Sequence, residues 1–310
     1  MIRYPACLLA TCVIPWDERG DFVESLFIDE VHGLLKLTKH LYVFGTAGEG
    51  YAVTDRQFER ITRVFHEAMR AGAAEPMVGI ISLSLGTIVE RIEIARDIGV
   101  RQFQISLPSW GALTDDEVSV FFRETCGRFP DCRFLHYNLL RTKRLITPEQ
   151  YASLAEMHPN LVATKNSTNS MDRLQKLMRL APALRLFPNE TGFVHASELG
   201  ECGLLASVAP LNSATCRMFF EAGRVGNRPL LLELQKEIAH LTEHLLALAG
   251  ASALIDGAFD KMLWKMHDDR FPLRLLPPYS GASEEGFRKF AALVQSRFPR
   301  WNPAERGGPT

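Results

Sequence analysis

The chain has 310 residues, of which 46% are hydrophobic and 23% are charged, an ordinary balance for a globular protein. The formal net charge is −1, so no long-range field attracts nucleic acid or an anionic membrane, and a small-molecule partner is expected. No run of about eighteen apolar residues occurs, so no membrane-spanning helix is expected. The six cysteines form no C-x-x-C pair, which is typical of a reduced, cytoplasmic protein.

The first apolar run, CLLATCV at residues 7–13, allows two interpretations. After Arg3 it has the length of a signal-peptide core, but PWDERGD follows it in place of a small-residue cleavage site. We therefore expect the first buried strand of the fold here.

Short apolar runs then recur between amphipathic stretches. They predict strands at residues 7–13, 41–44, 77–81, 102–106, 133–137, 161–165, 184–187 and 203–208. Strands that alternate with helices at this spacing are typical of a (β/α)₈ barrel, and a doubly wound open sheet is the main alternative. After residue 213 only helical patterns follow, at residues 218–225, 230–250 and 284–298. We expect a catalytic barrel over residues 1–225 and a helical appendage over residues 226–310.

Three of the connecting helices carry clear start signals. Residues 55–72 have one apolar stripe, with Thr54 as cap and Gly72 as stop. Residues 114–127 begin at a threonine followed by three acids, and residues 147–158 begin at Thr-Pro.

Lys165 stands at the end of the strand LVATK, where the active site of such a barrel lies. Burial in an apolar pocket disfavours the charged amine, and a neutral amine can attack a ketone to form a Schiff base. The ordinary alternative is a lysine that reaches from the strand tip to solvent. Tyr137 ends the preceding strand, so its hydroxyl could lie near the lysine nitrogen and relay protons. A strand tyrosine is otherwise usually a core residue.

The loop GTAGEG at residues 45–50 follows the second strand and matches neither phosphate-binding glycine motif. Its backbone N–H groups could hold a small carboxylate, with the Thr46 hydroxyl beside them. A plain structural turn, in which Glu49 bonds to backbone, is equally compatible.

A second motif, HLTEH at residues 240–244, matches the H-x-x-E-H pattern of inverted zinc peptidases. It lies in the expected appendage and lacks a convincing third ligand nearby, so we expect no metal.

Together, GTAGE at 45–49, YN at 137–138 and VATKNST at 162–168 resemble the dihydrodipicolinate synthase/N-acetylneuraminate lyase family. The similarity runs from ATCVIPWDERGDFV near the start to PLRLLPPYSGASEEGFRKF near the end. The resemblance implies a (β/α)₈ barrel that acts without metal or cofactor on pyruvate or a 2-oxo acid, as a homodimer or homotetramer.

The resemblance also implies roles for single residues. Lys165 would form the imine, Tyr137 would relay protons, and Thr46 would supply a relay hydroxyl. The residues expected to bind substrate are Gly45, Ala47, Trp110, Arg141, Asn189 and Leu205, the last through its backbone carbonyl.

Several positions depart from the family pattern. Ala47 replaces a second hydroxyl residue, and Trp110 stands where many relatives carry a tyrosine donated across a subunit interface. Arg141 matches the carboxylate-binding arginine of the synthases only across a gap, and PNE at 188–190 replaces a Gly-Asp turn. Indole cannot relay a proton.

We therefore expect a Schiff-base carbon–carbon lyase or aldolase, acting on pyruvate or a 2-oxo acid such as one derived from a sugar acid. The alternatives are a dehydratase of a deoxy-sugar acid, dihydrodipicolinate synthase proper, and a catalytically lapsed barrel that binds 2-oxo acids.

Overall fold

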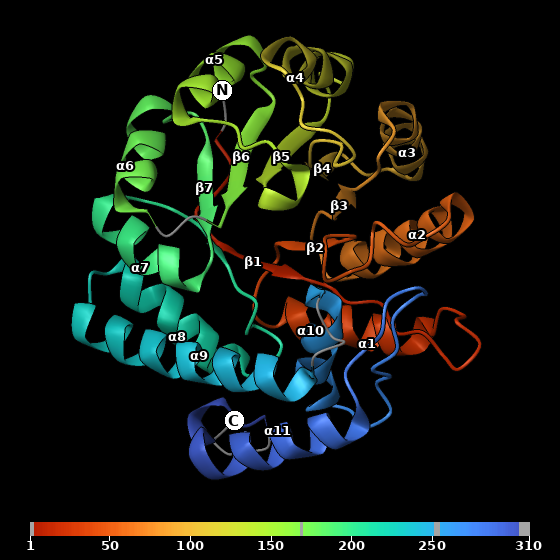
Figure 1. The fold of residues 1–310 in the computed structure, drawn as a ribbon, viewed down its shortest axis with the longest axis vertical. Helices are drawn as coiled ribbons and strands as arrows, with labels where there is room; N and C mark the ends of the chain where they lie inside the picture. The colour runs from red at the N-terminus through yellow and green to blue at the C-terminus, as the bar shows by residue number, and fades with distance from the viewer. Residues whose placement is uncertain (1–2, 168–169, 251–254, 304–310) are drawn as a thin grey trace.

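The computed structural model describes residues 3–167, 170–250 and 255–303 and contains a barrel of parallel strands (Figure 1). The strands are β1 (Leu8–Thr11), β2 (Leu41–Val43), β3 (Met77–Ile80), β4 (Gln102–Ile105), β5 (Arg133–Asn138), β6 (Leu161–Asn166), β7 (Arg185–Pro188) and β8 (Leu204–Leu205). Their order is β7-β6-β5-β4-β3-β2-β1-β8. The N–H of Gly203, just before β8, donates to the carbonyl of Leu186 in β7 at 2.8 Å, so the two end strands lie side by side and the barrel is nearly closed. The predicted (β/α)₈ barrel is confirmed.

The strands separate two apolar clusters because successive side chains point to opposite faces. On β2, Leu41 and Val43 pack outward against the helices, whereas Tyr42 points into the barrel. The interior cluster includes Leu9, Tyr42, Met77, Leu135, Phe187 and Leu205. The interior is therefore filled with side chains up to the level of the site.

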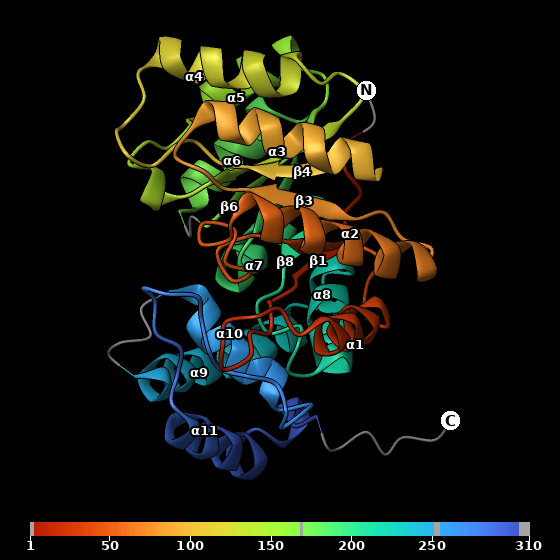
Figure 2. The same cartoon turned by 90° about the vertical axis from the view of Figure 1, so that its right-hand side faces the viewer.

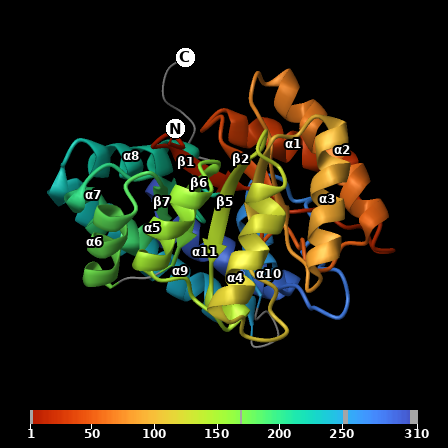
Figure 3. The same ribbon diagram turned by 90° about the horizontal axis from the view of Figure 1, so that it is seen from above.

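Helices surround the strands, with α2 and α3 on one side and α5 to α7 on the other (Figure 3). They are α1 (Glu24–Leu35), α2 (Asp55–Ala71), α3 (Leu85–Ile98), α4 (Asp115–Phe122), α5 (Pro148–Met157), α6 (Met171–Leu180), α7 (Glu190–Leu199) and α8 (Ser213–Arg224). The predicted caps Thr54, Thr114 and Thr147 each accept from the N–H three residues on. In the predicted helix 114–127, the α-helical part ends at Phe122. The remaining residues form one π turn, η1 (Arg123–Gly127).

The last helices lie together at one end of the molecule (Figure 2). They are α9 (Arg228–Ala249), α10 (Asp256–Lys265) and α11 (Glu284–Arg297). The sequence pattern predicted α9 and α11 but missed α10, which has no side-chain cap to mark its start. In the described part of the chain, no helix combines the length and apolarity needed to cross a bilayer.

Candidate functional site

Lys165 and Tyr137 are register partners on the adjacent strands β6 and β5. Their relative exposures are 6% and 5%, so both are buried despite their polar groups. Lys165 Nζ lies 3.6 Å from the centroid of the Tyr137 ring. The predicted neighbourhood of the two residues is therefore present, with the amine above the aromatic face.

Tyr42 is a second tyrosine at this lysine, and the sequence reasoning missed it. Lys165 Nζ donates to the Tyr42 hydroxyl at 3.4 Å, and Tyr42 is only 2% exposed. The strand alternation contained a usable signal, because Tyr42 is the one residue of LYV that must face the barrel interior. A phenol facing inward needs a polar partner, and Lys165 provides it.

The protonation of Lys165 differs from the sequence-based expectation. Burial lowers the pKa of its amine, but the neighbouring Tyr137, Tyr42 and Asp256 raise that pKa by more. The pKa of Lys165 therefore lies above its ordinary value, and the side chain is an ammonium at neutral pH. The expectation of a neutral amine was wrong because it considered burial without the polar neighbours. Any attack by this nitrogen must be coupled to proton transfer.

The glycine loop lies directly above Tyr42. A Cβ on Gly45 would be 2.5 Å from Tyr42 Cε2 and 3.2 Å from its hydroxyl oxygen, so only glycine fits there. Thr46 and Ala47 follow and are 4% and 5% exposed. The chain then turns back, with Gly50 N–H donating to the Gly45 carbonyl at 3.3 Å. Two of the site's four side chains, those of Tyr42 and Thr46, therefore come from one short segment.

Glu49 anchors this loop to the rest of the molecule. Its Oε1 accepts from Trp16 Nε1 at 2.9 Å and from Lys261 Nζ at 2.6 Å, and its Oε2 accepts from the Leu276 N–H at 2.7 Å. Glu49 is fully buried and has a left-handed φ of 53°. Such a conformation is uncommon outside glycine and persists where the surroundings fix it. Glu49 therefore bonds to backbone, as one interpretation expected, and also to two side chains.

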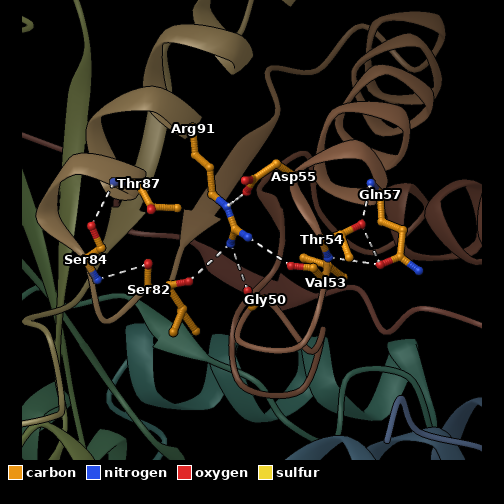
Figure 4. A network of polar contacts seen from close by, with 10 residues as sticks. Gly50, Val53, Thr54, Asp55, Gln57, Ser82, Ser84, Thr87 and Arg91 are labelled. Atoms are coloured by element: carbon orange, nitrogen blue, oxygen red, sulfur yellow. Dashed lines mark hydrogen bonds and ion pairs between the residues drawn. The ribbon is translucent and has the colours of Figure 1, made fainter.

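Arg91 supports the same loop from α3 (Figure 4). Its guanidinium donates to the carbonyls of Gly50 at 3.1 Å, Val53 at 2.9 Å and Ile81 at 3.2 Å, and it pairs with Asp55 at 2.9 Å. Arg91 is 6% exposed. The several N–H donors of this one guanidinium hold the connection between β2 and α2 in place.

Two carboxyl groups from α10, those of Asp256 and Asp260, interact electrostatically with the lysine. Asp260 is 6% exposed and makes no hydrogen bond within the described residues. Burial, then Asp256 and Glu190, raise the pKa of Asp260 well above its ordinary value, while Lys165 lowers it. Asp260 therefore keeps its proton to a higher pH than an exposed aspartate does. Sequence reasoning missed it together with α10.

Arg141 is already paired, because its Nη2 lies 3.0 Å from Asp256 Oδ1. The guanidinium also lines a cavity of about 420 Å³ beside Tyr137. The other lining residues are Asn138, Leu139, Leu140, Leu145, Asn166, Ser167 and Arg173. A cavity of this size suits a small ligand. A larger cavity, about 490 Å³, lies between α1 and α10 and contains none of the predicted site residues.

The remaining predicted residues lie in different environments. Trp110 is 83% exposed in the single chain and does not line this cavity. The side-chain oxygen of Asn189 caps α7 by accepting from the Gly192 N–H at 2.9 Å. Leu205 belongs to the barrel interior. Thr168, at the end of the VATKNST motif, lies outside the described residues.

The described residues contain no group of three His, Cys, Asp or Glu side chains placed to hold a metal ion. His244 packs its ring against Phe298, with centroids 6.4 Å apart. The zinc interpretation of residues 240–244 therefore gains no support from the structure.

Comparison with known proteins agrees with this architecture. The model of the dihydrodipicolinate synthetase family matches residues 5–296. A 4-hydroxy-tetrahydrodipicolinate synthase from Nostoc punctiforme is 29% identical over 147 residues, 47% of this chain and 49% of that protein. The chain thus spans about half the length of this curated relative.

Two solved structures extend the likeness in fold. YagE, a prophage protein of the dihydrodipicolinic acid synthase family from E. coli K12 in complex with pyruvate, has a TM-score of 0.84 at 14% identity and covers 94% of this chain and 98% of its own. CdNal from Clostridium difficile, in complex with mannosamine, has a TM-score of 0.80 at 17% identity and covers 93% and 97%.

Proposed function

Since the chain belongs to the dihydrodipicolinate synthetase family, we propose that it is a Schiff-base-forming carbon–carbon lyase or aldolase. Its substrate would be pyruvate or a 2-oxo acid such as one derived from a sugar acid. The observation that carries the proposal is Lys165, a buried lysine at the end of β6 with aromatic hydroxyl groups around its amine. A lysine buried at this end of a barrel has no evident structural role, because no described carboxylate pairs with it directly.

The amine of Lys165 would attack the carbonyl carbon of the 2-oxo acid. The protonated imine that results withdraws electrons from the neighbouring carbon, so a C–C bond there can break or form. Tyr137 would exchange a proton with the substrate oxygen during this step. No metal or other cofactor is required, because the imine itself accepts the electron pair.

The substrate carboxylate would lie on the loop of Gly45, Thr46 and Ala47, where backbone N–H groups and the Thr46 hydroxyl are available. The Leu205 carbonyl and the Asn189 turn would border the same space. Arg141 would contact the distal part of the substrate together with Asp256, and Trp110 would approach it from a neighbouring subunit or loop.

The direct test is covalent trapping. Incubation with pyruvate and borohydride should attach a reduced adduct to Lys165, detectable by mass spectrometry of peptides. Lys165→Ala should abolish the adduct, whereas Lys143→Ala, at a lysine whose Nζ bonds to the Trp110 carbonyl, should keep it. Failure of the wild-type protein to trap any 2-oxo acid would replace this proposal with that of a binding protein.

A second candidate is dehydration of a deoxy-sugar acid through the same imine. Asp260 favours it, because burial raises the pKa of this carboxyl group and a carboxylic acid that keeps its proton can protonate a departing hydroxyl. Products separate the two reactions. A lyase releases pyruvate and an aldehyde, whereas a dehydratase keeps the carbon chain intact.

We further propose a cytoplasmic homodimer or homotetramer. Trp110 and Leu140 support the assembly, since these large side chains are 83% and 80% exposed in the single chain. Analytical ultracentrifugation of the wild type and of Trp110→Ser would test it, and a monomeric wild type would contradict it.

A further inference from the structure

Tyr42 presents its hydroxyl group to the amine of Lys165. Lys165 Nζ lies 3.4 Å from the Tyr42 hydroxyl but 5.7 Å from the Tyr42 ring centroid, so the phenol points its oxygen at the amine. Tyr137 brings its ring face to 3.6 Å from Nζ and also hydrogen-bonds to the amine. Tyr42 is therefore a second phenol at the same nitrogen, and it contacts the amine through its oxygen.

Tyr42 also reaches the carboxylate-binding loop. Its hydroxyl oxygen is 3.2 Å from the point where a Gly45 Cβ would stand. A 2-oxo acid has its carbonyl next to its carboxylate, so a substrate held by the loop and attacked by Lys165 must place its carbonyl oxygen between them. The Tyr42 hydroxyl lies in that interval.

Imine formation requires proton transfer between these atoms. The balanced step converts Lys–NH₃⁺ and O=C into Lys–NH⁺=C and water. The C–N bond forms, the C–O bond breaks, and two protons leave nitrogen for oxygen. Since Lys165 is an ammonium at rest, both protons are present at the start and no external acid or base is consumed.

A phenol that accepts from nitrogen and donates to oxygen can carry out this transfer without becoming ionised. Burial raises the pKa of Tyr42, so its neutral form persists throughout. Its register partner Thr11, on β1, holds a hydroxyl beside it and favours transient negative charge on the phenol. The surroundings of Tyr42 therefore suit a residue that passes protons on better than one that stays ionised as a base.

We propose that Tyr42 is a catalytic residue that passes the two protons from Lys165 Nζ to the substrate oxygen as the imine forms, and returns them as it hydrolyses. The proposal rests on the proposed function of Lys165. It gives this chain a second phenol from within one subunit, where Trp110 replaces the tyrosine that many relatives share across an interface.

The test measures the rate at which the imine forms. Wild type and Tyr42→Phe are mixed with saturating pyruvate and quenched with borohydride after increasing times, and the adduct is quantified by mass spectrometry. Tyr42→Phe keeps the ring that packs under Gly45 and removes only the oxygen. We expect the rate to fall on the order of 10²-fold or more, as for loss of a general acid–base group. The trapped fraction at long times should stay close to that of wild type, since a relay changes rates in both directions.

Tyr4→Phe is the matched control. Tyr4 is also buried in the barrel interior, 2% exposed, but its hydroxyl lies 3.3 Å from His40 Nδ1. The Tyr4→Phe variant should form the borohydride-trapped adduct at the wild-type rate. Thr11→Val should slow trapping roughly 2- to 10-fold, the worth of one hydrogen bond.

The outcomes separate the two proposals. A wild type that never traps pyruvate overturns the proposed function. A wild type that traps, beside a Tyr42→Phe that traps equally fast, overturns the role of Tyr42 alone. A reduced trapped fraction with an unchanged rate also overturns it, because that pattern indicates a binding or structural effect.

Discussion

Glu49 and Lys261 form an ion pair that is closed to solvent, with Nζ 2.6 Å from Oε1 and both side chains 0% exposed. The pair joins the glycine loop to α10. Lys261→Met should leave the Glu49 carboxylate buried beside only two neutral donors. Breaking such a pair from one side typically costs about 3–5 kcal/mol. Urea unfolding should show this loss in the free energy of unfolding, together with weaker trapping of pyruvate.

The control is a surface pair of the same chemistry. Lys289 and Glu285 are 2.6 Å apart but 61% and 69% exposed. Lys289→Met should cost less than about 1 kcal/mol. Equal losses for the two variants would contradict the special position of Lys261.

Arg91→Lys should destabilise the loop after β2. A lysine cannot reach three carbonyls and a carboxylate at once, so some buried acceptors lose their donors. Each unsatisfied acceptor typically costs about 1–3 kcal/mol of stability. We expect a lower free energy of unfolding and a higher pyruvate concentration for half-maximal trapping. Arg63→Lys, at an exposed pair with Glu59, should change neither. An Arg91→Lys protein that matches wild type in both measurements would contradict the role of the network in Figure 4.

His136 should make the fold sensitive to acid. Burial lowers the pKa of this histidine to about 3, and its Nδ1 lies 2.6 Å from the Tyr151 hydroxyl. In the unfolded chain the pKa returns to about 6.5. Between these values the unfolded state binds a proton that the native state does not, so stability falls as pH falls through 6.5 toward 3. The contribution to the slope approaches about 1.4 kcal/mol per pH unit.

The measurement compares urea unfolding at pH 7, 6 and 5 for wild type and His136→Asn. The variant is less stable at pH 7, but its stability should depend less on pH. If the free energy of unfolding changes with pH equally in the two proteins, His136 is not the group that titrates.

We expect little synthase activity with pyruvate and aspartate semialdehyde. That aldehyde carries its own carboxylate, and Arg141, which could bind it, already pairs with Asp256 at 3.0 Å. A coupled assay beside a retro-aldol screen of 2-oxo acids checks this. Turnover at ordinary synthase rates would show that Arg141 exchanges Asp256 for the substrate. Asp256→Asn, which frees the guanidinium, should raise any residual synthase activity.

Much of the fold could be predicted because its signals are local. Apolar runs marked the strands, and Thr54 and Thr147 marked helix starts through contacts within three residues. Lys165 and Tyr137 could be paired because consecutive parallel strands place their ends together.

The rest depended on contacts between distant segments. Asp260 meets the site only because α10 docks there, and no local pattern reports where a helix docks. The pKa direction of Lys165 was missed for the same reason, since Tyr42 stands 123 residues away in the chain. Pattern reasoning identified the buried lysine but not all of its surroundings.

The three partners of Glu49 also impose an order on how the molecule is assembled. Trp16 precedes the glycine loop, whereas Lys261 and Leu276 are synthesised more than 200 residues after it. A nascent chain that has completed all eight strands already contains Lys165, Tyr137 and Tyr42, yet Glu49 still lacks its counter-ion. The loop geometry described here therefore requires that the segment with Lys261 and Leu276 has been synthesised and has docked.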